Sequence, residues 1–360
     1  MAAIPKTKMT QQFDISPEQE AKMSRYFYRQ FFVKTPPLKN REGSLRGKTA
    51  IITGSNTGLG LETAGQLMDL GLSKLIIAVR SVEKGESARA KLLERRKQPS
   101  EPYDIVIWKL DLSSYQSVID MAERAKNLER LDIVVLNAAL FRITQRFNPE
   151  TKVDEDVHVN YLANALLMVH ILPTLAASAK ANQQPGRLVL VSSDAAGWAK
   201  FTERSHRPIL DAFKLKDENW NMQERYGTSK LLGQLFLAEI ARRVSPSVVT
   251  IDAVNPGFCY GSELSRDGDG SFLGFLFRIF TRIVGKPLWM GARSVVHATA
   301  GFGQEVHGQY VEDGLIRPMA PILYTEEGEE VSKHLWNETM AELAFANVEG
   351  IIKSVSGVQA

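Results

Sequence analysis

The chain has 360 residues, 44% of them apolar and 24% charged, which is typical of a folded globular protein and excludes a largely disordered one. The length fits one large α/β domain with extensions better than two complete domains. A formal net charge of +3, with both signs mixed along the chain, argues against nucleic acid as the main partner.

The sequence has few features that would direct the protein to a membrane or to an oxidising compartment. The single cysteine, Cys259, excludes an intramolecular disulfide and fits a reducing compartment, so we expect a cytoplasmic protein. We expect no signal peptide, because the N-terminus lacks an uninterrupted apolar run. The most apolar stretch, residues 271–289, is broken by three basic residues and a proline, so we expect no transmembrane segment. The six histidines are scattered, which predicts no metal site.

The chain divides into an N-terminal extension, residues 1–46, and a main domain, residues 47–360. The extension is rich in charged and aromatic residues and ends in Pro36-Pro37 and a basic stretch, and a short helix is expected over residues 17–33.

Apolar runs of strand length alternate with stretches of helix length from Lys48 onward. The runs are continuously apolar, which indicates strands buried on both faces, as in a parallel sheet between two helix layers. The pattern predicts an α/β fold with a doubly wound, Rossmann-type parallel sheet. Strands are expected at 49–54, 74–80, 104–112, 131–139, 186–193 and 248–257, with helices at 59–70, 82–96, 115–127, 154–179, 223–244, 290–302 and 329–346.

A glycine-rich segment follows the first expected strand and opens the first helix. Glycines at this place let the backbone turn sharply and approach a pyrophosphate, which the helix N-terminus stabilises with free N–H groups. The segment therefore predicts a dinucleotide site formed by Gly54, Ser55, Asn56, Thr57, Gly58, Leu59 and Gly60.

The second strand ends in Arg80, where an enzyme that prefers NAD usually carries an acidic residue. A guanidinium can pair with a 2′-phosphate, so we expect NADP(H), although a solvated arginine is the alternative. Asp111 and Leu112 end the third strand, and two roles remain open for the Asp111 carboxylate. It either accepts a hydrogen bond from the adenine amino group or caps the following helix, a task that Ser113 or Ser114 could share.

Polar residues that could act as acids, bases or hydrogen-bond donors in catalysis lie at the ends of strands and on one helix. Tyr226 and Lys230 are four residues apart and therefore share a helix face. A lysine cation favours the phenolate and makes the phenol a usable acid/base. Ser193 and Asn137 end two further strands, at the edge where open α/β sheets bind ligands. Asn160 is a polar residue in an apolar helix and needs a partner.

The motifs TGSNTGLG, LNAA, VN, SS, YGTSK and NPG, in this order over residues 47–260, resemble the short-chain dehydrogenase/reductase family, in particular its retinol-dehydrogenase-like and fungal biosynthetic members. The resemblance implies that Tyr226 is the acid/base, that Lys230 lowers its pKa and binds the nicotinamide ribose, and that Ser193 orients the substrate. It also implies that Asn160 holds a relay water, that Asn137 and Ala138 line the cofactor cleft, and that Pro256 and Gly257 flank the nicotinamide.

Two departures concern the nicotinamide end. The usual Asn-Asn-Ala-Gly is replaced by residues 136–139, LNAA, and the threonine often found after Pro-Gly is absent, with Ser262 as a substitute at altered spacing.

Residues 258–290 stand where the family has its substrate lid. They are rich in phenylalanine, leucine and isoleucine, which indicates a lipophilic carbonyl or alcohol substrate. Two other interpretations remain open for this segment: a helix packed on the core or on a second subunit, and a membrane-surface helix. The segment 194–225, which joins Ser193 to Tyr226, is expected to form part of the substrate wall.

The sequence thus predicts an NADP(H)-dependent oxidoreductase that interconverts a lipophilic ketone or aldehyde and its alcohol, as in secondary metabolism. Two alternatives keep the fold without the redox step: a cyclase, dehydratase or epimerase, and an NADPH-binding scaffold or sensor. The resemblance also implies a homodimer or homotetramer.

Overall fold

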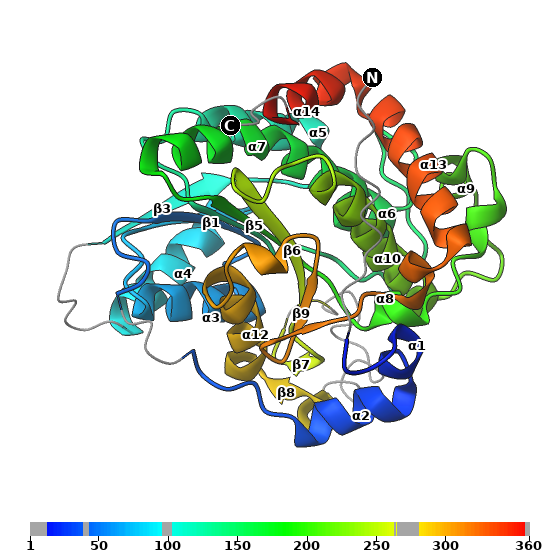
Figure 1. The fold of residues 1–360 in the computed structure, drawn as a ribbon, viewed down its shortest axis with the longest axis horizontal. Coiled ribbons are helices and arrows are strands. Elements are labelled where there is room, and N and C mark those ends of the chain that lie inside the picture. Colours follow the sequence, from blue (N-terminus) through cyan, green and yellow to red (C-terminus); the bar gives the residue numbers. More distant parts are fainter. Residues whose placement is uncertain (1–12, 39–42, 96–102, 263, 265–280, 357–360) are drawn as a thin grey trace.

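The computed structural model describes residues 13–38, 43–95, 103–262, 264 and 281–356. These residues form an eight-stranded sheet with helices on both faces (Figure 1). Its strand order is β10-β9-β6-β5-β4-β1-β2-β3, and all its pairs are parallel except β9 with β10. The strands are β1 Thr49–Thr53, β2 Lys74–Val79, β3 Asp104–Lys109, β4 Ile133–Leu136, β5 Gly186–Val191, β6 Val249–Asn255, β9 Tyr310–Glu312 and β10 Leu315–Arg317.

Two apolar cores, one on each face of the sheet, explain why the strands are apolar without alternation. Side chains of successive strand residues point to opposite faces. In β1, Ile51 packs into one core, while Ala50 and Ile52 pack into the other. Val134 and Val135 of β4 divide in the same way. Each residue of the central strands β1, β4 and β6 is therefore covered, and apolar residues are favoured at successive positions.

The helices form one layer on each face. One layer holds α3 Gly58–Asp69, α4 Val82–Arg95 and α12 Leu288–Ala300. The other holds α5 Tyr115–Ala125, α6 Glu155–Val157 with the π-helix His158–Leu162 and α7 Ala163–Asn182, then α10 Met222–Ala241, α13 Glu326–Glu342 and α14 Val348–Ser356. Shorter helices are α8 Ala195–Trp198, α9 Ile209–Ala212 and the 3₁₀ turns Thr202–Ser205, Gln304–Val306, Pro321–Tyr324 and Ala344–Ala346.

The expected fold class is confirmed, and each of the six expected strands forms. The last two strands, β9 and the edge strand β10, were missed because each has only three residues and no long apolar run. A two-stranded sheet, β7 Cys259–Tyr260 with β8 Lys286–Pro287, was missed for the same reason. The strand order reverses between β4, β1 and β2, which places a ligand crevice at the carboxyl ends of these strands.

The apolar helix Glu155–Asn182 is long enough to cross a membrane by length and composition, but most of it is buried inside the protein. It packs against α5 and α14, so its apolar character is explained by the core. The expected lid, 258–290, is described only at its two ends, and its phenylalanine-rich part, 265–280, lies outside the described residues.

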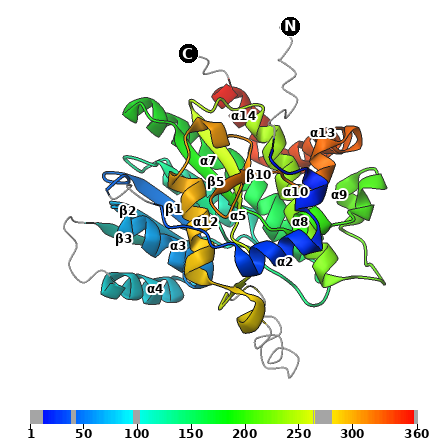
Figure 2. The same cartoon turned by 60° about the horizontal axis from the view of Figure 1, so that its bottom comes forward.

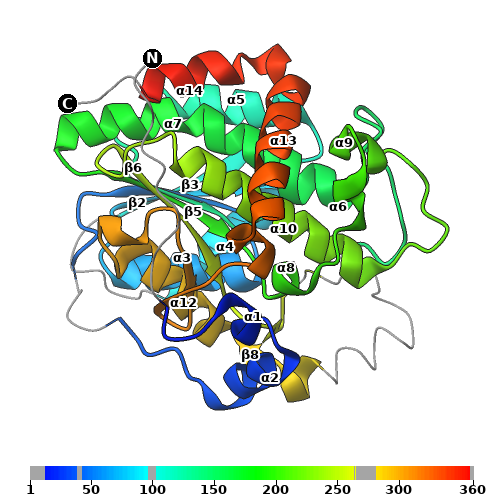
Figure 3. The ribbon, with the colours of Figure 1, turned by 45° about the vertical axis from the view of Figure 1, so that its right-hand side comes forward.

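The expected helix at 17–33 forms as two pieces, α1 Pro17–Glu20 and α2 Met23–Phe32. Ser16 caps α1 in a capping box with Gln19. Both helices lie against the main domain beside α8, and α2 lies beside β8 (Figures 2 and 3). The division of the chain at residues 46 and 47 stays a prediction.

The burial of a leucine predicts how much its replacement by alanine lowers the free energy of unfolding. Leu166 in α7 is fully buried in the core, whereas Leu93 in α4 is 43% exposed. Leu166→Ala should lower the free energy of unfolding by about 2–5 kcal/mol, because it leaves a cavity. Leu93→Ala, the same chemical change, should cost less than about 0.5 kcal/mol. Equal losses in urea unfolding would contradict this assignment of the core.

Candidate active site

A cleft of about 1900 Å³ lies at the carboxyl ends of the central strands. Ligand pockets for a single small molecule measure roughly 300–1000 Å³, so this cleft has room for a dinucleotide together with a substrate. Its lining brings together the expected residues Gly54, Asn56, Thr57, Gly58, Leu59, Gly60, Arg80, Asp111, Leu112, Asn137, Ala138, Ser193, Tyr226, Lys230, Pro256 and Gly257.

The glycine loop has the backbone shape that a pyrophosphate site needs. Gly54 and Gly58 have positive φ values of 64° and 55°, which other residues rarely adopt. A Cβ at Gly60 would lie 2.7 Å from the Gly54 carbonyl oxygen, so the helix could not approach the loop this closely with a side chain there. The Thr57 side chain makes no capping bond with α3, which leaves first-turn N–H groups for an anion.

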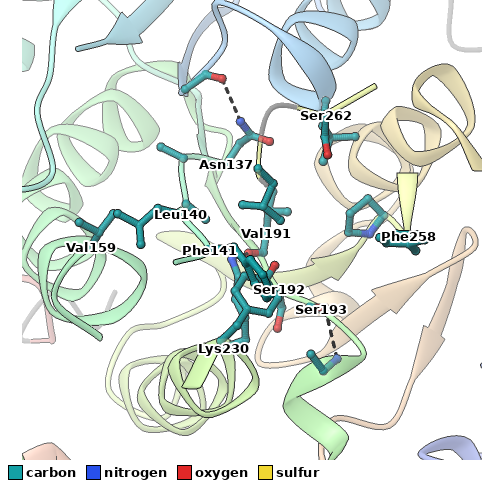
Figure 4. Close-up of a pocket in the computed structure, with 18 of the residues that line it drawn as sticks. Asn137, Leu140, Phe141, Val159, Val191, Ser192, Ser193, Lys230, Phe258 and Ser262 are labelled. Atoms are coloured by element: carbon teal, nitrogen blue, oxygen red, sulfur yellow. Dashed lines mark hydrogen bonds between the residues drawn. The ribbon is translucent and has the colours of Figure 1, made fainter. Parts of the chain in front are cut away.

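Asn137 holds this loop from the neighbouring strand, as Figure 4 shows. Its Nδ2 donates to the carbonyl oxygens of Thr53, at 2.9 Å, and Gly54, at 3.3 Å. The Thr53 hydroxyl in turn accepts from the N–H groups of Asn137 and Ala138. Ser55 is fully buried and donates to the Ile52 carbonyl at 2.8 Å, so its side chain faces away from the cleft. Ser55 thus shapes the loop from inside.

Arg80 directly follows β2, lines the cleft and is exposed. Ser81 and Lys84, which sequence reasoning missed, line the cleft beside it. Neither Arg80 nor Lys84 forms an ion pair with any residue that the structure describes. A lysine five residues after the end of β2, in the first turn of α4, is the signal that could have identified this second cation.

The two open roles of Asp111 are resolved in part by its contacts. Its Oδ1 accepts from the N–H of Ser113, at 3.0 Å, and from the Ser113 hydroxyl, at 2.7 Å. Ser114, and not Asp111, is the residue that caps α5. The Asp111 carboxylate therefore fixes the turn before the helix while it lines the cleft together with Leu112.

Tyr226, Lys230 and Ser193 meet at the centre of the cleft. Tyr226 and Lys230 come from α10, and the Lys230 Nζ lies 5.7 Å from the centre of the Tyr226 ring. The Lys230 ammonium donates to the Val191 carbonyl at 2.9 Å, which ties it to the end of β5. Ser193 follows that strand and bonds to Tyr226. Ser192, by contrast, is buried and accepts from Gln234, so its role is structural.

Burial dominates the electrostatics of this centre. It raises the pKa of Tyr226 above its usual value, and the hydrogen bond with Ser193 opposes this in part. Burial also lowers the pKa of Lys230 to about 8. Sequence reasoning expected Lys230 to bring the pKa of Tyr226 down toward neutrality. In this structure the desolvation of the phenol is the largest effect, because the surrounding protein disfavours the phenolate.

Asn160 lies in the π-helix His158–Leu162, which interrupts the helical ladder next to the site. Its Oδ1 accepts from the Leu140 N–H, at 2.8 Å, and its Nδ2 donates to the Leu140 carbonyl, at 2.8 Å, and to the Ser229 hydroxyl, at 3.0 Å. The Ser229 hydroxyl donates to the Tyr226 carbonyl. The partner that this polar residue was expected to need is therefore the backbone between β4 and α6, together with α10.

The turn after β6 closes the nicotinamide end. Gly257 has a φ of 72° and donates its N–H to the Asn255 side chain at 3.0 Å. Ser262, the substitute for the absent threonine, lines the cleft. Figure 4 shows Phe258 and Ser262 across the cleft from Leu140 and Val159.

The substrate wall draws on more of the chain than the sequence predicted. From the segment 194–225, Trp198 lines the cleft, whereas Phe201 and Phe213 are buried in the core. Phe141 packs edge-on against Tyr226, with ring centres 5.2 Å apart. Met23, Tyr26 and Phe27 of α2 also line the cleft. Sequence reasoning missed these, although aromatic residues clustered in an expected helix were a signal for a binding surface.

Comparisons with known proteins agree with this geometry. A family model described as short chain dehydrogenase matches residues 48–203. The chain is 52% identical to the short-chain dehydrogenase fogG of Aspergillus ruber, with 96% of this chain and 99% of the relative covered. It is 40% identical to the short chain dehydrogenase/reductase mfmJ of Annulohypoxylon moriforme, with 92% and 94% covered.

Solved structures show the same fold at low identity. The complex of Pseudomonas aeruginosa RhlG with NADP matches with a TM-score of 0.55 at 20% identity, over 79% of this chain and all of that one. The NADH-dependent reductase A1-R′ complexed with NAD matches with a TM-score of 0.55 at 16% identity, over 77% and 99%. The high identity to the fungal relatives along nearly the whole chain shows that this protein belongs to the short-chain dehydrogenase/reductase family of nicotinamide-dependent oxidoreductases, in its fungal branch.

Proposed function

We propose that the protein reduces a lipophilic ketone or aldehyde to an alcohol with NADPH. The observation that carries the proposal is the arrangement of Tyr226, Ser193 and Lys230 around one cleft at the carboxyl ends of the strands. Carbonyl reduction needs a protonated acid at the forming alkoxide, whereas alcohol oxidation needs the phenolate as a base. Burial raises the pKa of Tyr226, which is consistent with the protonated form that reduction needs.

Each residue of the site has its own role in this reaction. The cofactor, when bound, supplies the hydride. Ser193 and Tyr226 donate hydrogen bonds to the carbonyl oxygen, and Tyr226 transfers its proton to that oxygen as negative charge develops on it. The Lys230 ammonium, held by the Val191 carbonyl, stabilises the phenolate that remains. Asn160 keeps α10 in register with the loop after β4, so that Tyr226 and Phe141 stay in contact.

The preference for NADPH is supported by the cations at the end of β2. Arg80 and Lys84 are exposed at the cleft and lack acidic partners among the described residues, so both are available to a 2′-phosphate. The solved neighbours include complexes with NADP and with NAD, so the cofactor preference has to be judged from this chain's own residues. Cellular NADP pools are held reduced, which again favours reduction as the physiological direction.

A lipophilic substrate is supported by the side chains around Tyr226. Leu140, Phe141, Val159 and Phe258 surround the reacting centre (Figure 4), and aromatic residues of α2 extend this surface. Such a lining favours an apolar carbonyl compound that a few polar groups orient. The fungal relatives are consistent with a role in secondary metabolism. The unpaired Cys259 supports a cytoplasmic location, and a homodimer or homotetramer stays a prediction of family resemblance.

The test is an assay in which the protein is mixed with NADPH and one carbonyl compound from a panel of aromatic and long-chain aldehydes and ketones. The loss of NADPH absorbance measures the rate of reduction. Tyr226→Phe should lower kcat by about a hundredfold to ten-thousandfold, because it removes the proton donor. The Kd for NADPH, measured by cofactor fluorescence, should stay unchanged. Full activity of this variant would refute the acid assignment. A wild-type protein that binds NADPH but reduces no member of the panel would point to the non-redox alternatives.

The cofactor preference has its own test. Arg80→Asp should lower kcat/KM for NADPH by about tenfold to a hundredfold, because a charge-assisted hydrogen bond to the phosphate contributes about 1.5–3 kcal/mol. It should leave kcat/KM for NADH equal or higher. Lys84→Ala should produce a smaller loss of the same kind. An unchanged NADPH/NADH ratio in Arg80→Asp would remove the basis for NADP preference.

The pKa of Lys230 predicts how activity depends on pH. The ammonium is the functional form and persists below a pKa of about 8, so kcat/KM for NADPH should fall as the pH rises through that value. The measurement is a pH profile of initial rates with saturating carbonyl substrate. In Lys230→Arg, whose guanidinium stays charged, any remaining activity should show no such decline. A wild-type profile that is flat well beyond pH 8 would contradict the assignment.

A further inference from the structure

The segment that carries Ser193 is held from outside the sheet by the N-terminal helix α2. Asp194 directly follows Ser193, and its carboxylate forms an ion pair with Arg29 of α2. Arg29 is only 4% exposed, and its guanidinium also contacts the carboxylates of Glu20 and Glu312, the latter at 3.0 Å. One buried cation thus joins the N-terminal segment, the residue after the catalytic serine, and β9.

The short helix α8, which begins two residues after Ser193, makes further contacts with the same segment. Trp198 donates from its Nε1 to the Ala21 carbonyl at 2.9 Å. The Trp198 and Tyr26 rings meet edge to face, with ring centres 4.9 Å apart. Figure 3 shows α8 directly above α1 and α2. The chain after Ser193 is therefore fixed at both Asp194 and Trp198.

The other side of the nicotinamide end is attached to the same helix. The Glu312 carboxylate accepts from the Asn255 Nδ2, and the Asn255 Oδ1 accepts from the Gly257 N–H at 3.0 Å. Gln30, next to Arg29, donates to the Phe258 carbonyl at 2.8 Å and accepts from the Phe258 N–H at 3.2 Å. Arg29 and Gln30 together therefore connect the exits of β5 and β6, which flank the reacting centre.

We propose that Arg29 is a positioning residue of the active site: its buried fork fixes the Ser193 segment against the turn after β6, and α2 thereby becomes a wall of the substrate cleft. A planar guanidinium can serve several carboxylates in fixed directions at once, which an ammonium on a flexible stem cannot do. Met23, Tyr26 and Phe27 line the cleft from the same helix, so the residues that contact the substrate and those that position Ser193 belong to one element. The activity part of this proposal rests on the function proposed above.

Arg29→Lys is the test variant, because it keeps the charge and removes the fork. We expect kcat with the best aldehyde of the panel to fall by about a hundredfold, as a displacement of roughly 1 Å in a catalytic group can do. The Kd for NADPH should stay within about threefold, since the carboxylates that Arg29 contacts belong neither to the glycine loop nor to the end of β2. The matched control is Arg25→Lys on the same helix, which pairs with the same Glu20 but is partly exposed, and it should behave like the wild type.

A double-mutant cycle with Ser193→Ala separates positioning from a general loss of stability. If Arg29 acts through Ser193, Arg29→Lys should lower kcat little further in the Ser193→Ala background. A loss of equal size in both backgrounds would overturn the proposal. So would a wild-type kcat in Arg29→Lys.

Amide hydrogen exchange gives a readout that needs no substrate. Peptides that cover residues 191–200 and 255–260 should exchange at least about tenfold faster in Arg29→Lys, whereas peptides from β1, β2 and β3 should not change. If the wild type reduces no carbonyl but this local change appears, the proposed function fails and the structural link stands. Unchanged exchange in both segments would refute the link. Should Arg29→Lys not fold, Asp194→Ala, which removes the carboxylate that Arg29 contacts beside Ser193, has the same expected results.

Discussion

The burial of a parallel sheet on both faces is the constraint from which the rest of this structure follows. Each central strand must place apolar side chains above and below, so helices have to cover both faces, and each crossover returns the chain to the same end of the sheet. The carboxyl ends therefore gather at one edge, where polar residues can be placed without harm to either core. The glycine loop, Asn137 and Ser193 all stand immediately beyond such an end.

The features that the sequence indicated most clearly are local ones. The glycine loop, the Tyr226–Lys230 pair and the six central strands each depend on spacing within a few residues, and the structure forms the strands and gathers these residues in one cleft. The missed features depend on tertiary contacts. Strand β9 pairs with β6, and β10 pairs in turn with β9, while α2 is held at the cleft by Arg29, which meets carboxylates that lie far away in sequence. Ser55 shows the limit even within a motif, since its burial could not be read from its place in the loop.

The catalytic centre illustrates a competition between two physical effects. A neighbouring cation favours the phenolate of Tyr226, whereas desolvation favours the phenol, and here desolvation is the larger effect. The same burial lowers the pKa of Lys230 to about 8, and the ammonium donates to the Val191 carbonyl at 2.9 Å. Burial therefore favours the neutral form of both side chains, the phenol of Tyr226 and the amine of Lys230.

The cluster around Arg29 has a consequence for how the protein is made. Its partners lie near the beginning, the middle and the end of the chain, so a ribosome must synthesise β9 before the cluster can be completed. The glycine loop and the first strands can fold earlier, because their contacts are closer in sequence. The dinucleotide site would then form before the Ser193 segment is fixed. A nascent or C-terminally shortened chain would bind the cofactor but would not reduce a carbonyl.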